Sequence, residues 1–244
     1  MKKIITLFLL IIITLFNGQT WNISYEYKVK NLLFNDEFTF PASLIVDNKE
    51  KSLYTVQFGI VNQIDTKVNA GAFSLIDRSS YKYVLFSNKP NAFTIGDEIN
   101  GKKYIFKDSI PVMDYEIKNE SKLINNIKLY KAEVLFRGRK YVIWHDPYSK
   151  IKAAPWKFAN FPGLAYEIYD EDNLFRWTLQ KIEKSESEIR NPVEALEVNN
   201  NFLSYVEYPK LKYPSIYIQD EVKNNSINKS QNRDGLEKLF EWEK

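Results

Sequence analysis

The chain contains no cysteine and a single histidine among its 244 residues. The absence of cysteine excludes disulfides, thiolate metal sites, a cysteine nucleophile and a lipid anchor on an N-terminal cysteine. One histidine cannot build a metal site from several imidazoles. We therefore expect a protein that is held together by its core alone, and we expect no cofactor.

A basic excess is also lacking. The formal net charge is +3, and Lys2 and Lys3 supply two of these charges, so nothing in the remaining chain points to a nucleic-acid partner. Glycine is scarce, with 8 residues, whereas there are 16 Tyr, 16 Phe and 5 Trp. Because Tyr and Phe suit half-buried pleated surfaces, this composition predicts a β-rich fold.

The first 18 residues, MKKIITLFLLIIITLFNG, have the layout of a secretory signal peptide. Two lysines precede the apolar run 4–16, which is shorter than the roughly 20 residues of a membrane-spanning helix. We expect cleavage near Gly18 or Gln19 and no transmembrane segment in the mature chain, rather than an uncleaved anchor. The expected location is the periplasm or the outer-membrane surface.

Alternation of apolar and polar residues predicts strands along most of the chain. One face of the first mature strand carries Ile23, Tyr25, Tyr27 and Val29. Further strands are predicted over residues 52–60, 81–88 and 102–108, with 88–101 as a turn-rich connection. Two hairpins follow, one turning at RGRK (137–140) and one at the acidic DEDN (170–173).

These patterns predict a single mainly-β domain over residues 19–220. Its antiparallel sheet, built of hairpins, is expected to be strongly curved or partly closed around the aromatic side chains. Helix signals are few. Asn191 and Pro192 suit a helix start, residues 201–208 could form two turns that stop before Pro209, and residues 221–244 read as a polar linker and a short C-terminal helix.

The segment PWKFANFPGLAYEIYD (155–170) mixes turn residues with large apolar ones. Pro162 and Gly163 suit the two central positions of a type II turn. The aromatic side chains could form a surface for a ligand or partner, or they could cover an open end of the sheet, and the second role is favoured because such side chains are usually buried. The candidate binding or motif residues are Pro155, Trp156, Phe158, Phe161, Pro162, Gly163 and Leu164.

Residues 115–183 resemble the GLPGLI family, small exported proteins of Bacteroidota-type bacteria. The similarity lies in the order of a strand with Lys-Ala, an Arg-Gly-Arg turn, a Trp-containing return strand, and Pro155, Phe158, Pro162, Gly163 and Leu164 at the positions of the family motif. The chain departs from that motif at Ala154, at Asn160-Phe161 and at Ala165. The resemblance implies an exported β-rich protein and implies no activity.

Three further groups of residues are candidate sites for catalysis, calcium binding or anion binding. His145-Asp146 could support catalysis, but neighbours on a strand point to opposite faces, which favours an ordinary strand-end histidine. The acidic turn 170–173 could hold Ca²⁺, but it lacks the spacing and the glycine of a calcium loop, so an ordinary turn is favoured. Arg137, Arg139 and Lys140 could contact an anionic polymer or lipid head group, but a solvated turn is the simpler interpretation.

The leading functional hypothesis is a non-catalytic binding or accessory protein of the cell envelope. Its concave aromatic face would accept a peptide, a lipid, a glycan or an outer-membrane protein. A second hypothesis is a hydrolase that uses sheet carboxylates such as Glu133 or Glu167, which would have to converge in a cleft. A third is a purely structural envelope protein, and whether the protein is an enzyme stays open, with a non-enzyme favoured.

Overall fold

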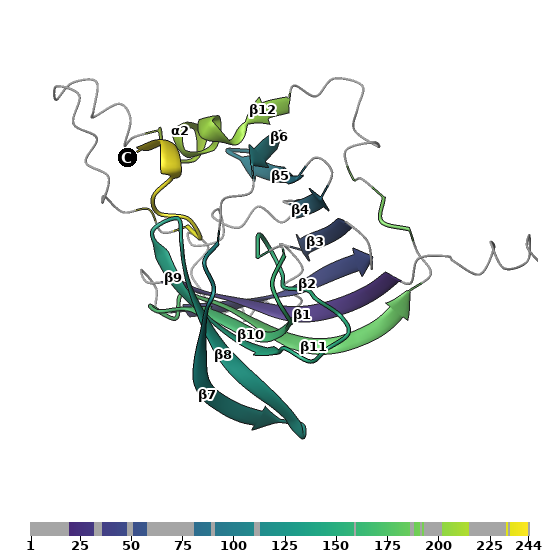
Figure 1. Cartoon of the computed structure of the whole chain (residues 1–244). Helices are drawn as coiled ribbons and strands as arrows, with labels where there is room; N and C mark the ends of the chain where they lie inside the picture. Colours follow the sequence, from purple (N-terminus) through teal and green to yellow (C-terminus); the bar gives the residue numbers. More distant parts are fainter. Residues whose placement is uncertain are drawn as a thin grey trace, which may run out of the picture.

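The computed structural model describes residues 20–31, 36–47, 51–57, 81–88, 91–109, 113–158, 160–185, 188–190, 192, 202–214, 233 and 235–243. The expected signal peptide, the helix expected after Pro192 and the polar linker lie outside these ranges. Within them the protein is one large sheet with a short helical segment near the C-terminus, so the predicted fold class is confirmed (Figure 1).

Twelve strands make up this sheet. In chain order they are β1 (Thr20–Asn31), β2 (Asp36–Asp47), β3 (Lys51–Gln57), β4 (Tyr81–Asn88), β5 (Asn91–Ile99), β6 (Lys102–Ser109), β7 (Glu116–Ile124), β8 (Ile127–Phe136), β9 (Arg139–Asp146), β10 (Leu164–Asp170), β11 (Phe175–Ser185) and β12 (Phe202–Ser204). After β12 come the 3-10 turn η2 (Tyr205–Glu207), the helix α2 (Tyr208–Lys212) and the 3-10 turn η3 (Glu241–Glu243).

The order of strands across the sheet is β12-β6-β5-β4-β3-β2-β1-β11-β10-β9-β8-β7. Every neighbouring pair is antiparallel except the short pair of β12 with β6. Three two-residue turns, Asn100-Gly101, Asn125-Asn126 and Arg137-Gly138, have positive φ at both residues, as type I′ hairpin turns require.

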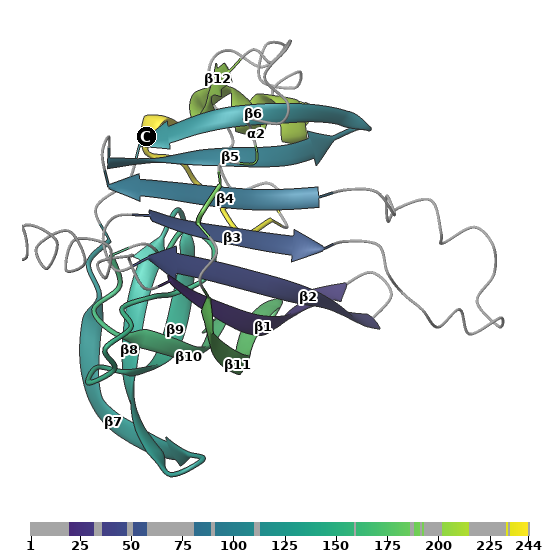
Figure 2. The ribbon, with the colours of Figure 1, turned by 90° about the vertical axis from the view of Figure 1, so that its right-hand side faces the viewer.

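The sheet is strongly curved. Strands β6 to β1 form a gently twisted ladder, and β11 to β7 turn away beneath it (Figure 2). The register of β1 against β11 shifts between Ser24 and Tyr25, and that of β10 against β9 shifts between Ala165 and Glu167. Because such irregularities bend a strand and increase its twist, they mark places where the sheet curves.

The concave side of the sheet holds the main core. The alternation predicted for β1 is confirmed, since Ile23, Tyr25 and Tyr27 are all buried there. Trp177 of β11 is fully buried and donates to the Tyr54 hydroxyl over 2.7 Å. A smaller cluster lies on the convex side, where Ile189 packs with Leu53, Tyr83, Leu85 and Ile105.

The sequence patterns miss four strands, β2, β5, β7 and β12. β2 contains Pro41, which argues against a central strand. The structure resolves this conflict, because β2 pairs with β1 along its whole length but with β3 only from Ala42 onward. Among the described residues, Pro41 therefore pairs with β1 on one side and lies beyond the ladder with β3 on the other. β5 runs through residues 88–101, where a turn-rich connection was expected.

A short helix near the C-terminus is confirmed, but its bounds differ from the predicted ones. Residues 202–204 form β12 rather than a helix, and Pro209 stands in the first turn of α2 instead of ending a helix before it. Proline is favoured at this position because its missing N–H would have no intrahelical partner. Among the described residues after 214, η3 alone is helical, and Leu236, Leu239 and Phe240 belong to an irregular segment that docks on the sheet.

Substitution of two turn glycines tests this docking. Gly101 and Gly138 have φ of +74 and +77, so alanine at either position costs about 1 kcal/mol of stability from backbone strain. A Cβ on Gly138 would also lie 2.9 Å from the Leu239 Cβ, whereas one on Gly101 meets no described atom within 4 Å. We expect Gly138→Ala to lower the free energy of unfolding in urea more than Gly101→Ala, and equal losses would contradict the docking.

Candidate functional site

The candidate motif residues form a loop that enters the concave side of the sheet. This aromatic loop, residues 153–164, is closed at its base by hydrogen bonds from the Ala153 N–H to the Gly163 carbonyl and from the Ala165 N–H to the Ala153 carbonyl, both 2.9 Å long. Pro155 is buried and Pro162 is exposed. Leu164 is buried and begins β10.

The three large aromatic side chains of the loop lie in the core. Trp156, Phe158 and Phe161 are 4%, 0% and 2% exposed. Trp156 stacks on Trp177 at 6.1 Å between ring centroids, and Phe158 meets Tyr141 edge to face at 5.1 Å. The loop therefore fills much of the concave interior with its own side chains.

Gly163 has a different role from the one expected. A type II turn would give it a positive φ, but the positive values in the loop belong to Trp156 and Asn160, both 59°. A Cβ on Gly163 would lie 2.5 Å from Nδ1 of His145 and 2.7 Å from the Asp146 carbonyl oxygen. Glycine is thus required by close approach to β9 and not by turn geometry.

A cavity of about 560 Å³ lies beside the loop, at the end of the sheet where the β2–β3 and β4–β5 hairpins turn. We call it the rim cavity. Its apolar lining comes from Val46, Phe86, Ala153, Ala154, Phe158, Phe161 and Pro162. Its polar lining comes from Asp47, Lys51, Ser52, Asn88, Lys152 and Asn160. Three of the seven predicted motif residues thus line it.

A second cavity, of about 730 Å³, crosses the sheet at β11, β1, β2 and β3. Its lining is mostly hydroxyl and amide side chains, including Asn22, Ser43 and Gln180, with Glu26 as the single charged group. None of the predicted motif residues takes part in it.

His145 is buried behind the rim cavity. Its ring meets that of Phe161 edge to face at 4.9 Å, and neither ring nitrogen has a hydrogen-bond partner among the described residues. Burial lowers the pKa of His145, and Lys152 lowers it further, whereas Asp146 raises it. The neutral form is therefore the one that the fold accepts. A nucleophile or an orienting carboxylate in contact with this ring is not found in the described part of the chain.

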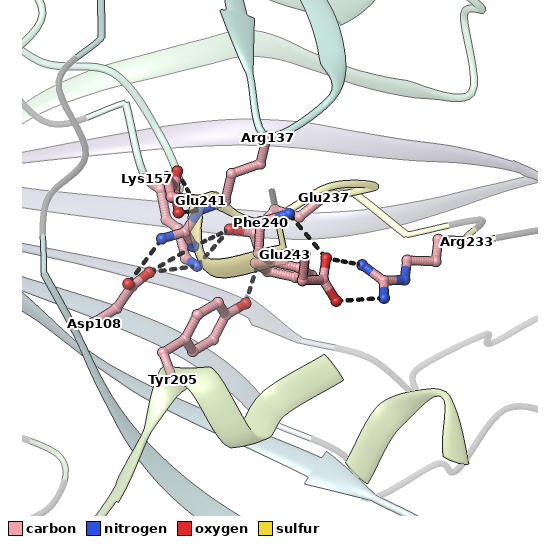
Figure 3. A network of polar contacts seen from close by, with 9 residues as sticks. All are labelled: Asp108, Arg137, Lys157, Tyr205, Arg233, Glu237, Phe240, Glu241 and Glu243. Carbon is pink, nitrogen blue, oxygen red and sulfur yellow. Dashed lines mark hydrogen bonds and ion pairs between the residues drawn. The ribbon is translucent and has the colours of Figure 1, made fainter. Parts of the chain in front are cut away.

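A network of buried charges lies at the other side of the aromatic loop, where the C-terminal segment 235–243 crosses the concave face (Figure 3). Arg137 forms a bidentate ion pair with Asp108 of β6, at 2.8 and 2.9 Å. It also donates to Glu237 over 2.6 Å and to both oxygens of Glu241 over 3.1 Å. Lys157 of the aromatic loop donates to the buried carboxylates of Asp108 and Glu237, over 3.0 and 2.8 Å.

Aromatic rings enclose these charges. The Arg137 guanidinium lies 5.2–5.4 Å from the ring centroids of Phe136, Tyr205, Phe240 and Trp242. The Lys157 ammonium lies 3.5 Å from the centroid of Tyr205, whose hydroxyl donates to Glu237 over 2.5 Å. Cation–π contacts and full hydrogen bonding together compensate for the removal of these groups from water.

The pKa values follow from burial and from the opposite charges. Burial raises the pKa of Glu237, but Lys157 and Arg137 lower it more strongly, and the result is about 2. Burial lowers the pKa of Lys157, although both carboxylates oppose this effect. Burial also opposes the charge of Arg137, yet Glu237 and Asp108 hold its pKa above the ordinary value. Glu237 and Arg137 are therefore charged at neutral pH.

The interpretation of the RGRK turn as solvated was wrong for both arginines. Arg137 is 6% exposed and Arg139 is 2% exposed. Arg139 pairs with the buried Asp170 over 2.5 Å and donates to the Gly235 carbonyl over 2.9 Å. Asp170 also accepts from the Phe175 N–H, so the acidic turn is part of a hairpin tied to β9 and to the C-terminal segment.

The two carboxylates named for a hydrolase do not converge. Glu133 of β8 and Glu167 of β10 alternate with core residues and so lie on the convex face. Glu133 pairs with Lys118, Lys131 and Lys140, and Glu167 pairs with Lys122 and Arg176. Neither lines the rim cavity. A group of three or more His, Cys, Asp or Glu suited to a metal ion is absent from the described residues.

The sequence patterns missed the network because its members are distant in the chain. Asp108, Lys157 and Glu237 come from three segments that nothing local connects. One signal was present, since Lys157 stands between Trp156 and Phe158 in an apolar loop. A lysine in that position must either reach water or meet a buried carboxylate.

Comparisons with known proteins show the fold and no family. No family model matches the chain, and no curated protein matches it. Two crystal forms of PNGF-II are similar in structure, each with a TM-score of 0.52, at 15% and 14% identity. The alignments cover 82% of this chain and 34% of PNGF-II, so the chain spans about a third of that protein and shares its fold over that part.

Two further structures show a weaker likeness. One is a domain from Vibrio parahaemolyticus described as an outer membrane lipoprotein-sorting protein, with a TM-score of 0.37, 10% identity and coverage of 75% of this chain and 91% of that one. The other is a LolA superfamily protein from Nitrosomonas europaea, with a TM-score of 0.26, 8% identity and coverage of 75% and 90%. These TM-scores do not establish a common fold.

A matched pair of substitutions tests the network. Glu237→Gln leaves Arg137 and Lys157 short of a buried carboxylate, and we expect a loss of about 3–5 kcal/mol in the free energy of unfolding. Glu241 contacts the same arginine, but its side chain is 46% exposed, and we expect Glu241→Gln to cost at most about 1 kcal/mol. Chemical denaturation measures both, and a similar cost for the two would refute the network's role.

The single histidine allows a second test. The pKa of His145 is lower in the folded chain than in the unfolded chain. As the pH falls through about 6.5, the unfolded chain therefore takes up a proton before the folded chain does. Stability should therefore be full above that pH and decline below it, by up to about 1.4 kcal/mol per pH unit. The variant His145→Gln should lack this decline between pH 7 and pH 5. An unchanged pH dependence in the variant would show that His145 is not its source.

Proposed function

We propose that the protein is an exported, non-catalytic binding protein of the cell envelope that holds an apolar chain in the rim cavity, and that it belongs to the GLPGLI family. The observation that carries this proposal is the cavity itself. Its volume of about 560 Å³ falls within the range of small-molecule sites, roughly 300–1,000 Å³.

The lining of the cavity favours an apolar ligand over a glycan. Phe86, Phe158 and Phe161 and four smaller apolar residues form one part of its wall, and six polar residues form the other part. Binding sites of this composition take their affinity from apolar contact and their orientation from a small number of polar groups. A lipid acyl chain fits this lining better than a peptide or a sugar does.

Export and family membership rest on the sequence. The residues 1–18 have the layout of a signal peptide, and residues 115–183 carry the resemblance to the GLPGLI family. Within the described residues, no helix is long and apolar enough to cross a membrane. Fractionation of the native host, with detection of the protein in cytoplasmic, periplasmic and outer-membrane fractions, tests the location, and recovery in the cytoplasm would overturn it.

The binding role is tested by filling the cavity. Ser52 lines it from β3, so Ser52→Trp places a large side chain in the cavity without removing a core residue. We expect at least a tenfold loss of affinity for the neutral apolar dye N-phenyl-1-naphthylamine, measured by fluorescence titration, because the added ring occupies the ligand's space.

Thr94→Trp is the matched control, because Thr94 alternates with the core residues Phe93 and Ile95 and faces the convex side. This variant should bind the dye as the wild type does. Native mass spectrometry of the protein purified from its host should in addition show a co-purified lipid. If wild type and Ser52→Trp bind the dye alike and no ligand co-purifies, the binding role is wrong.

A further inference from the structure

The ionisable groups of the rim cavity are unevenly distributed. Two lysines, Lys51 and Lys152, and one carboxylate, Asp47, belong to its lining. The remaining polar groups, Ser52, Asn88 and Asn160, are neutral hydrogen-bonding side chains. The lining thus carries a positive excess beside apolar walls, an arrangement that distinguishes between ligand head groups of different charge.

The two lysines are available to a ligand. Within the described part of the chain, the Lys51 ammonium has no ion pair, and its side chain is exposed at the first residue of β3. Lys152 donates one hydrogen bond, of 2.6 Å, to the Pro147 carbonyl. An ammonium has three donors, so two remain for another acceptor.

The carboxylate is already engaged by the protein. Asp47 ends β2, and its Oδ1 accepts the backbone N–H of Lys51 over 2.9 Å. It thereby closes the β2–β3 turn and holds the start of β3 at the cavity. Its charge offsets one lysine at most, so a ligand meets a positive rim.

From this arrangement we propose that the ligand is an anionic amphiphile, with its carboxylate or phosphate group between Lys51 and Lys152 and its chain against Phe86, Phe161 and Pro162. The inference rests on the proposed function and specifies its ligand class. An anionic oxygen accepts charge-assisted hydrogen bonds from both ammonium groups, which a neutral head group accepts only weakly. The carboxylate of a fatty acid and the phosphate of a lipid share this chemistry.

The test compares amphiphiles that differ only in the head group. Dodecanoate, dodecyl phosphate, dodecanol and dodecyltrimethylammonium are used to displace N-phenyl-1-naphthylamine from the full mature chain, below their micelle concentrations. We expect the two anions to displace the dye at about tenfold lower concentration than dodecanol, and the cation to be the weakest. The anion with the lower midpoint identifies the source as fatty acid or phospholipid. Added salt should reduce the advantage of the anions, because the lysines are exposed.

Two double variants locate the effect. Lys51→Gln with Lys152→Gln should bring the anions to the level of dodecanol. Lys102→Gln with Lys103→Gln is the control. These lysines lie beside the β5–β6 turn, at the end of β5 that is far from the cavity, and they do not line the cavity. The control should behave as the wild type does. Exposed lysines of this kind seldom affect folding, so the wild type and the two double variants can be compared directly.

The outcomes separate this inference from the proposed function. If dodecanol displaces the dye as well as the anions do, or if the lysine double variant is unchanged, the anionic ligand class is refuted while the apolar binding site stands. A preference for the cation would refute it as well, and would point to Asp47. If no amphiphile displaces the dye and Ser52→Trp does not weaken dye binding, the proposed function itself fails.

Discussion

The bidentate ion pair between Arg137 and Asp108 joins two parts of the sheet that backbone hydrogen bonds leave apart. Asp108 belongs to β6, next to one edge, and Arg137 follows β8, next to the other edge. A sheet of twelve strands has to curl or split, and here it curls until side chains from its two ends meet. This buried contact can form only because the sheet is curved, and the aromatic loop lies in the space that the curvature encloses.

Burying this pair would be costly without further partners. Arg137 and Lys157 carry two positive charges, and Asp108 and Glu237 carry two negative ones, so the most buried part of the network is neutral. Glu237 comes from the C-terminal segment, which also donates the N–H groups of Lys238 and Leu239 to the Arg137 carbonyl. Without that segment the interior would hold one cation more than its carboxylates neutralise, which explains why Glu237 of this segment is buried.

The sequence predicts the strands that alternate and the turns that carry local signals. The hairpin at Gly138 and the buried face of β1 follow from periodicity and turn chemistry alone. The remaining features depend on contacts between distant segments. Pro41 is tolerated because β3 ends beside it, Gly163 is needed because β9 passes close to it, and Arg137 is buried because its partners stand 29 and 100 residues away. The rim cavity is hidden for the same reason, since its walls come from three strands and a loop.

The aromatic loop connects the network to the rim cavity over a few residues. Lys157 is held by two carboxylates on one side, while its neighbour Phe158 and the nearby Phe161 line the cavity on the other. Because a buried lysine with both carboxylates in place cannot shift without losing a hydrogen bond, the position of Phe158 is fixed by the network. The cavity wall is thus preorganised by the same interactions that close the sheet. A ligand that enters it meets rings already in place and needs to order only its own chain, which lowers the entropic cost of binding.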